Sequence, residues 1–131
     1  MKIAFYSTKP YDRIWFEPLG EQYGYEIHFI EFPCTRETLF LAKGCDAICI
    51  FVNDHVDSEM IEVLYDMHVK GILLRSAGFN NVDVKAAEDK IVILRVPSYS
   101  PEAVAEFATA VLVVAAFASG SRSDMKRNEK A

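Results

Sequence analysis

The fold is decided by one stretch, Leu74-Arg75-Ser76-Ala77-Gly78-Phe79-Asn80-Asn81-Val82-Asp83, which follows the apolar run Gly71-Ile72-Leu73-Leu74. The apolar run is typical of a strand buried in a parallel sheet. Gly78 permits a positive φ and a close approach of a ligand to the backbone, and Asp83 stands where a helix N-cap is expected. Open α/β sheets bind ligands outside the carboxyl ends of their strands, where free backbone N–H groups attract anions. The stretch therefore predicts either an anion-binding turn or an ordinary strand-to-helix connection.

Strands and helices are expected to alternate along the whole chain. The strands are predicted at 2–7, 25–31, 47–52, 72–75 and 91–96, and the strand at 47–52 is apolar on both faces, which places it centrally. Helices are predicted from Asp12 to about 23, from 35 to 44, from 57 with Met60, Ile61, Val63, Leu64 and Met67 facing inward, after Asp83, and from Ser100 onward. This alternation predicts an α/β, flavodoxin-like three-layer domain with a five-stranded parallel sheet over residues 1–118, followed by a polar tail at 119–131.

The composition excludes several classes of partner. Hydrophobic residues make up 51% of the 131 residues and charged residues 25%, so the chain is long enough and apolar enough for one globular domain. A net charge of −5, with no basic run in the body of the domain, argues against a nucleic acid or an anionic membrane as partner. The three cysteines lack metal-ligand spacing and are interpreted as buried, reduced thiols of a cytoplasmic protein.

A second stretch adds a family resemblance. Val96-Pro97-Ser98-Tyr99-Ser100-Pro101-Glu102-Ala103-Val104-Ala105-Glu106 follows the apolar run Ile91-Val92-Ile93-Leu94. This stretch, the segment Arg75 to Asp83 and the opening Met1 to Ser7 together resemble the D-isomer-specific 2-hydroxy-acid dehydrogenases, and more narrowly the D-lactate dehydrogenase branch. The resemblance covers the chain from Met1 to about Ala118.

The resemblance implies a set of substrate-binding residues. The backbone N–H groups of Ala77 and Gly78 would hold the carboxylate of a small 2-keto or 2-hydroxy acid, and the Tyr99 hydroxyl would reach the same carboxylate. Phe51 would line the pocket for the substrate side chain. The alternatives are a Tyr99 packed over the loop and a Phe51 that belongs to the core. Arg75 is interpreted as structural, and neither a catalytic residue nor a metal ligand is predicted.

The cofactor of the resembled family has no motif in this chain. The family transfers a hydride to or from NAD, which a Gly-x-Gly-x-x-Gly turn on a second domain binds. That motif and the family's downstream Arg, Glu and His are absent, and Phe107 stands where the family commonly has a His. We therefore expect the substrate-binding part of such an enzyme without its nucleotide-binding domain, a truncated form that binds no cofactor and is inactive alone.

Two other classes stay open from the residues themselves. A stand-alone small-carboxylate-binding or regulatory domain fits the sequence equally well. A receiver or flavodoxin-like module is disfavoured, because the first strand ends in Tyr6-Ser7-Thr8-Lys9, without acidic residues for magnesium and without glycine for a phosphate.

The last predicted helix carries a prediction about assembly. The segment 103–118 is apolar around nearly its whole circumference but too short to span a bilayer. We therefore expect a homo-oligomer formed through this helix.

Overall fold

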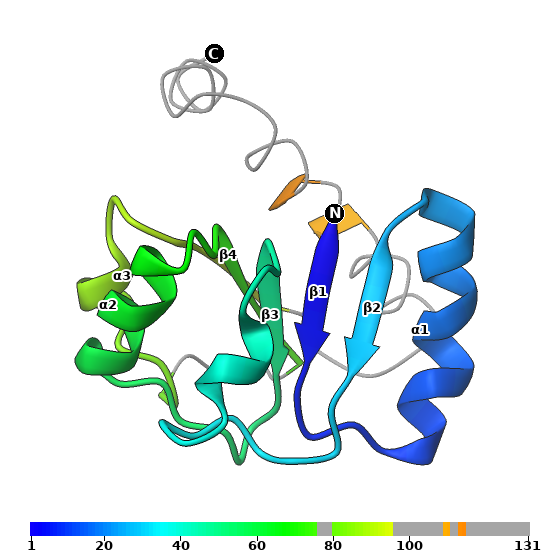
Figure 1. Cartoon of the computed structure of the whole chain (residues 1–131), viewed down its shortest axis with the longest axis horizontal. Helices are drawn as coiled ribbons and strands as arrows, with labels where there is room; N and C mark the ends of the chain where they lie inside the picture. The colour runs from blue at the N-terminus through cyan, green and yellow to red at the C-terminus, as the bar shows by residue number, and fades with distance from the viewer. Residues whose placement is uncertain (76–79, 96–108, 111–112, 115–131) are drawn as a thin grey trace.

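A computed structural model describes residues 1–75, 80–95, 109–110 and 113–114 of the chain (Figure 1). Its centre is one parallel sheet with the strand order β2-β1-β3-β4-β5. The strands are β1 (Lys2–Phe5), β2 (Glu26–Phe29), β3 (Ala47–Ile50), β4 (Gly71–Leu74) and β5 (Val92–Arg95). Four of the strands are shorter than predicted, and β4 has the predicted length but begins one residue earlier. All five lie where the sequence indicates, and β3 is central with all four residues buried. The predicted α/β fold with a five-stranded parallel sheet is confirmed, and its strand order is that of the flavodoxin-like doubly wound folds.

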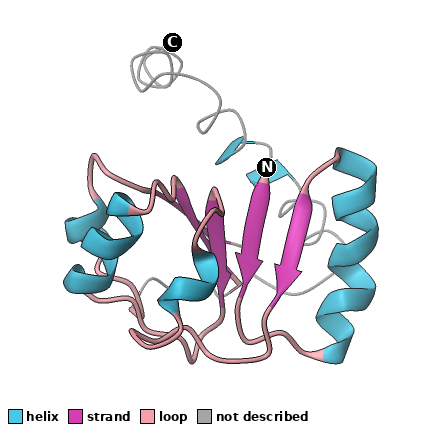
Figure 2. Ribbon diagram, viewed as in Figure 1, coloured by secondary structure: helices cyan, strands magenta, loops and turns pink. Residues whose placement is uncertain are grey.

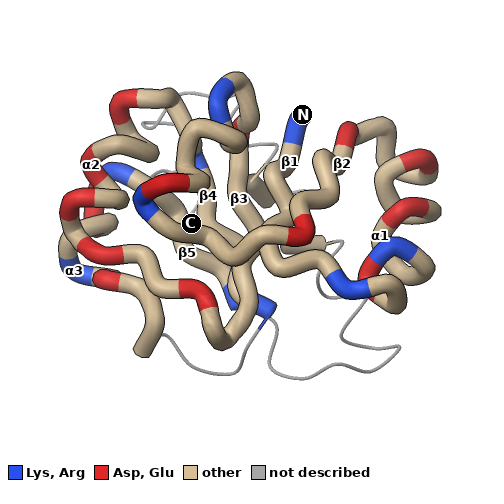
Figure 3. Tube along the Cα trace, turned by 60° about the horizontal axis from the view of Figure 1, so that its bottom comes forward, with Lys and Arg blue, Asp and Glu red and all other residues tan. Residues whose placement is uncertain are grey.

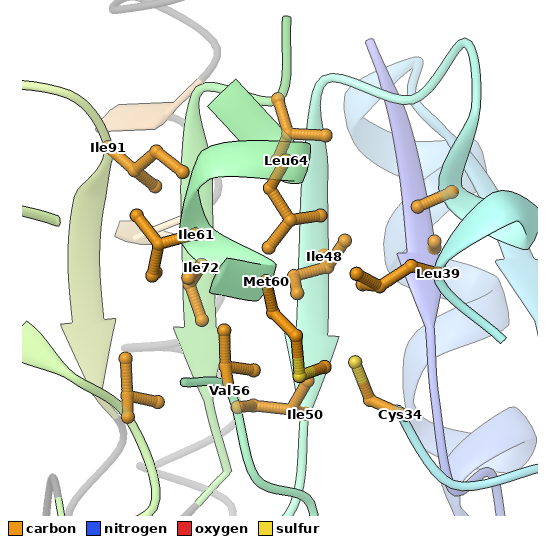
Figure 4. Packing of buried hydrophobic residues seen from close by; sticks show 14 of the residues in the cluster. Cys34, Leu39, Ile48, Ile50, Val56, Met60, Ile61, Leu64, Ile72 and Ile91 are labelled. Carbon is orange, nitrogen blue, oxygen red and sulfur yellow. The ribbon is translucent and has the colours of Figure 1, made fainter. Parts of the chain in front are cut away.

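Helical segments cover both faces of the sheet (Figure 2). They are α1 (Pro10–Tyr23), the 3-10 helix η1 (Leu39–Ala42), α2 (Ser58–Asp66) and α3 (Val84–Ala87). Side chains of η1, α2 and α3 pack against the larger core, part of which Figure 4 shows in close-up. The residues labelled there include Leu39, Ile48, Ile50, Met60, Ile61, Leu64 and Ile72.

The opposite face of the sheet is covered by α1 and by part of the last predicted helix. Residues 109–110 and 113–114 are helical. Val114 is fully buried against this face, whereas Val113 is 38% exposed. A Cβ placed on Gly71 would stand 2.9 Å from both methyl groups of Val114, so β4 needs a glycine where the helix crosses it. Val114 therefore packs on the sheet of its own chain.

The start of α1 differs from the prediction. The helix begins at Pro10, two residues before Asp12, and Asp12 does not occupy the N-cap position. Its carboxylate instead accepts a hydrogen bond of 2.8 Å from the backbone N–H of Lys9, so that it satisfies the helix start from within the first turn. Proline at the first helical position explains the earlier start. Gly24, with φ 73°, ends the helix as predicted.

The helix predicted over 35–44 is wrong except for the four residues of η1. The Thr38 hydroxyl donates to the carbonyl of Pro33 at 2.7 Å and accepts from the backbone N–H of Thr35 at 2.8 Å. These local bonds give the backbone an alternative to helical pairing. The inward position of Val63 on α2 is also wrong, because this side chain is 44% exposed.

The termini of α2 and α3 agree with the sequence more closely. Asp57 accepts from the N–H of Met60 at 2.9 Å, and Asp83 accepts from the N–H of Ala86 at 3.0 Å. All three cysteines are free and buried. In the part of the chain that the structure describes, no helix is long and apolar enough to cross a membrane.

Candidate functional site

The loops that follow β1, β2, β3 and β4 meet at the carboxyl edge of the sheet. This edge lies at the bottom of Figure 1, and Figure 3 turns it toward the viewer. The chain leaves β1 toward β2 on one side and places β3 on the other side, so the direction of winding changes between β1 and β3. Ligands of doubly wound folds bind at such a switch point.

Asp54 is the centre of a buried polar cluster at this edge. The residue is 1% exposed. Its carboxylate accepts hydrogen bonds from the Ser7 hydroxyl at 2.8 Å, the Cys34 N–H at 2.9 Å and the Phe51 N–H at 2.8 Å. These donors follow β1, β2 and β3 respectively, so one carboxylate joins three loops. Burial, with a smaller contribution from the Asp54 charge, raises the pKa of the Cys34 thiol to about 12.

Arg75 brings the positive charge of the cluster. Its guanidinium donates to the carbonyls of Tyr6 at 2.9 Å and Ser7 at 3.1 Å, and to the Cys49 sulfur at 3.4 Å. The carboxylate of Asp12 lies 3.8 Å away, and both side chains are almost completely buried. The guanidinium is buried and contacts groups of its own chain, which agrees with the structural role that the sequence predicts for Arg75.

The same guanidinium lies over two aromatic rings. Its central carbon is 4.1 Å from the ring centroid of Phe5 and 5.3 Å from that of Phe51. Cation–π attraction is stronger in such a desolvated setting than at the surface. Arg75 therefore helps to place the Phe51 ring at the exit of β3.

In the turn after β1, the backbone N–H groups already donate hydrogen bonds within the chain. Ser7 has a φ of 53°, a conformation that often opens an anion-binding concavity. Here, however, the N–H groups of Ser7 and Thr8 donate to the carbonyls of Phe32 at 3.0 Å and Ile30 at 2.9 Å. The N–H of Lys9 donates to the carboxylate of Asp12 in the first turn of α1. This turn does not offer the phosphate cradle that a flavodoxin needs.

Asn81 joins the exit of β4 to the exit of β3. Its side-chain amide donates to the carbonyls of Phe51 at 3.1 Å and Asp54 at 2.8 Å. Its own backbone carbonyl accepts from the N–H of Val56 at 2.8 Å, and Val56 forms an isolated parallel bridge with Val82. The segment beyond the predicted anion turn is therefore attached to the loop that carries Phe51.

Of the four predicted substrate-binding residues, Ala77, Gly78 and Tyr99 lie outside the described residues. Phe51 is described, and it is half-buried at the carboxyl end of β3. The sequence predicts Asp54 only as part of an exit loop, although an acidic residue in the loop after a central apolar strand is a usable signal for a polar cluster at this edge.

A dinucleotide and a metal ion each need a particular arrangement of residues. Gly20 and Gly24 belong to α1 and its end, Gly44 follows η1, and Gly71 begins β4, so none of these follows the carboxyl end of a strand. Such a glycine turn is what a dinucleotide pyrophosphate requires. The described residues therefore do not fit NAD. Within the same ranges, no group of three or more His, Cys, Asp or Glu side chains is placed to hold a metal ion.

A doubly wound parallel sheet with a polar cluster at its switch point defines the class of α/β ligand-binding domains. Residues 3–128 match the family model described as "D-isomer specific 2-hydroxyacid dehydrogenase, catalytic domain". The chain belongs to this dehydrogenase family.

Two relatives show the same relation. A 2-hydroxyacid dehydrogenase homolog of Haemophilus influenzae is 50% identical over 107 residues, which are 81% of this chain and 32% of that protein. The D-lactate dehydrogenase of Escherichia coli is 46% identical over 86% of this chain and 35% of its own length. The chain thus spans about a third of the length of these relatives.

Solved structures agree in fold. The apo-structure of D-lactate dehydrogenase from Escherichia coli matches with a TM-score of 0.71 at 46% identity, over 86% of this chain and 37% of that one. The NAD-complexed D-isomer specific 2-hydroxyacid dehydrogenase of Lactobacillus delbrueckii matches with a TM-score of 0.69 at 29% identity, over 86% and 34%. NAD is therefore a cofactor within this family.

Proposed function

We propose that this chain is the substrate-binding part of an NAD-dependent D-lactate or D-2-hydroxy-acid dehydrogenase, and that it binds a small 2-keto or 2-hydroxy carboxylate. The observation that supports this most directly is the match to the catalytic-domain model over residues 3–128. The 46% identity to a D-lactate dehydrogenase favours a lactate-sized acid within the family.

The proposed carboxylate site is the turn after β4. The N–H groups of Ala77 and Gly78 donate to the substrate carboxylate, and the Tyr99 hydroxyl donates to the same carboxylate. Charge-assisted hydrogen bonds of this kind favour an anion over a neutral acid. The turn after β4 is preferred to the turn after β1, because the N–H groups of Ser7 and Thr8 in the turn after β1 already donate to backbone carbonyls. Phe51 lines the side-chain pocket, which its half-exposed position at the exit of β3 permits.

In the proposed reaction, this chain binds the acid and the cofactor carries the hydride. NAD supplies the hydride in the family when it is bound. The residues of this chain bind and orient the acid. We therefore expect the purified 131-residue chain neither to oxidise D-lactate nor to reduce pyruvate with NAD(H). Turnover above contaminant level that is lost in Tyr99→Phe would contradict this expectation.

Binding is tested by titrating oxamate or pyruvate while backbone amide shifts are recorded. A single anion turn is expected to give a dissociation constant no better than about 1 mM, or about 4 kcal/mol. Shifts are expected in residues 76–83 and around Tyr99. Tyr99→Phe is expected to weaken binding severalfold, whereas Tyr23→Phe, on an exposed tyrosine of α1, leaves it unchanged. Shifts confined to another loop, or none at tens of millimolar, would overturn the proposal.

The proposal extends to assembly and location. We propose a homo-oligomer formed through the last helix, and a cytoplasmic protein whose buried thiols stay reduced. A net charge of −5 makes nucleic acids and anionic membranes poor partners for it.

A further inference from the structure

The outer edge of β2 has no neighbouring strand among the residues that the structure describes. β2 stands at one end of the strand order. On its inner side, the N–H groups of Glu26 and Ile30 both donate to backbone carbonyls on the β1 side at 2.8 Å. Successive residues of a strand direct their backbone groups to opposite sides, so Ile27 and Phe29 turn theirs away from β1. Backbone groups exposed in this way are a template for pairing with a further strand.

A groove of about 800 Å³ lies along this edge. One wall is α1, which lies beside β2 in Figure 1 and lines the groove with Arg13, Glu17 and Glu21. The other wall includes Leu41 of η1, which packs on the opposite face of the sheet. An exposed strand edge with room for side chains beside it is the arrangement by which proteins bind an extended peptide as an additional strand.

The groove is acidic. Glu17 and Glu21 are exposed and form no ion pair with any of the described residues. Glu26 adds a third carboxylate, which lies 2.7 Å from the ring nitrogen of His28 and 3.8 Å from the amino group of Lys2. The two carboxylates of α1 are therefore available to a positively charged partner.

The direction of α1 gives these two carboxylates a useful spacing. The Arg13 guanidinium carbon lies 4.8 Å from the ring centroid of Phe29, and the Tyr25 N–H donates to the Gly20 carbonyl at 3.0 Å, so α1 runs along β2. Four residues of a helix rise about 6 Å. Side chains two residues apart on one face of a strand are about 7 Å apart. A strand in the groove can thus bring basic side chains at positions i and i+2 to the two carboxylates.

From these observations we propose that the outer edge of β2 binds an extended segment of a partner protein with Lys or Arg at positions i and i+2. Main-chain hydrogen bonds to Ile27 and Phe29 add the segment to the sheet, and Glu17 and Glu21 attract its basic side chains. A second copy of this chain is a poorer occupant, because it would bring the same acidic groove against this one. β1 and β3 separate this edge from β4, and the inference does not rest on the proposed function.

The first test uses capped hexapeptides in which valine alternates with lysine or with glutamate. The lysine peptide is expected to slow hydrogen exchange at the N–H groups of Ile27 and Phe29 about tenfold or more at saturation, and the glutamate peptide to leave it unchanged. Methylating every second backbone nitrogen of the lysine peptide should abolish binding in one of the two possible registers, because only one set of N–H groups faces β2. Binding that leaves both amides unchanged, or that survives both methylation patterns, would overturn the proposal.

The second test changes the carboxylates of the groove. Glu17→Gln combined with Glu21→Gln is expected to weaken binding of the lysine peptide about fivefold at low salt, as measured from backbone amide shifts. The control Glu88→Gln, an exposed carboxylate next to α3, should leave the affinity unchanged. All three side chains are exposed, so the thermal midpoints should stay close to that of the wild type. Equal affinities in the double variant and the control would overturn the proposal.

The free chain distinguishes the other occupants of the groove. Fast exchange at Ile27 and Phe29 without peptide is expected, because an open strand edge leaves both N–H groups to water. Slow exchange that does not depend on protein concentration would show that another segment of the same chain pairs with β2. Slow exchange that appears only as the concentration rises would show that a second copy does. Either result would overturn the proposal.

Discussion

Arg75 illustrates how a buried cation can connect several loops at the carboxyl edge of a parallel sheet. Its guanidinium connects the carbonyls of Tyr6 and Ser7 to the end of β4, and it lies near Asp12. A planar group with several donors can satisfy these acceptors together, whereas a lysine would offer one compact charge.

Replacing Arg75 with methionine is expected to lower the free energy of unfolding by about 3–5 kcal/mol, because two buried carbonyls and a buried carboxylate lose their cation. Arg13→Met is the matched control. Arg13 is exposed and lies over the Phe29 ring at 4.8 Å, so its loss should cost less than about 1 kcal/mol. Urea denaturation followed by circular dichroism measures both. Equal losses in the two variants would show that the buried guanidinium has no special role.

Several buried thiols and phenols should make the free energy of unfolding depend on pH in the alkaline range. Burial is the main cause that raises the pKa of Cys34 to about 12, of Cys49 to about 11 and of Tyr25 to about 12. Burial also raises the pKa of Tyr6 above its ordinary range. In the unfolded chain the thiols titrate near 9.0 and the phenols near 10.0.

Below about pH 8 both states keep nearly all of these protons, so the groups leave stability unchanged. From about pH 9 to 11 the unfolded chain releases protons that the folded chain retains, so the free energy of unfolding should fall as pH rises. Urea midpoints measured from pH 7 to 11 check this, and Cys49→Ala should show a shallower decline than the wild type. A midpoint that stays level or rises to pH 11 would contradict the prediction.

At the scale of elements, the packing of the last helix on β4 depends on one glycine. Gly71→Ala is expected to destabilise the fold by about 1–3 kcal/mol, because the new methyl group meets both branches of Val114 at 2.9 Å and a β-branched side chain cannot turn away. In the double variant with Val114→Ala the extra cost should be smaller than the sum of the single changes. Simple additivity in this cycle would mean that the helix does not cross β4 at this point.

The elements that could be predicted from sequence are those decided by local pattern. The apolar run at Gly71–Leu74 and the caps Asp57 and Asp83 depend on neighbouring residues only, and the structure contains them. The helix over 35–44 failed because the hydroxyl of Thr38 binds backbone groups instead. Helical periodicity does not report that competition.

The site was less predictable because its bonds join distant segments. Asp54 and Asn81 are ordinary loop residues in the sequence, and only the meeting of the exits of β3 and β4 gives them partners. A turn motif can be identified from a local stretch, but the hydrogen bonds that support it cannot. Ala77, Gly78 and Tyr99 remain predictions.

At the scale of the whole molecule, two neighbouring valines of the last predicted helix differ in their exposure to solvent. Val114 faces its own sheet, so a charge there would disturb the fold and not only an interface. Val113 points outward and is 38% exposed. If the helix pairs with a second copy, the change Val113→Glu should abolish self-association while leaving the thermal midpoint nearly unchanged.

Sedimentation at tens of micromolar compares the wild type with Val113→Glu. Thr109→Glu, at another exposed position of the same helix, reports whether the contact extends along it. A wild type that sediments as a monomer and binds no dye for exposed apolar surface would show that the helix needs no partner copy.

The polar cluster at the carboxyl edge also bears on the order in which the chain acquires its structure. Its bonds join residues 47 positions apart for Ser7 and Asp54, and 69 positions apart for Tyr6 and Arg75. Contacts so distant along the chain form only after long loops have closed. During synthesis, β1, its loop and β3 emerge with two acidic side chains before the arginine that lies among them exists. The hydrogen bonds of the polar cluster can therefore be completed only after β4 and Arg75 have been synthesised, so the folding of this edge depends on a residue that the ribosome adds well after β1 and β3.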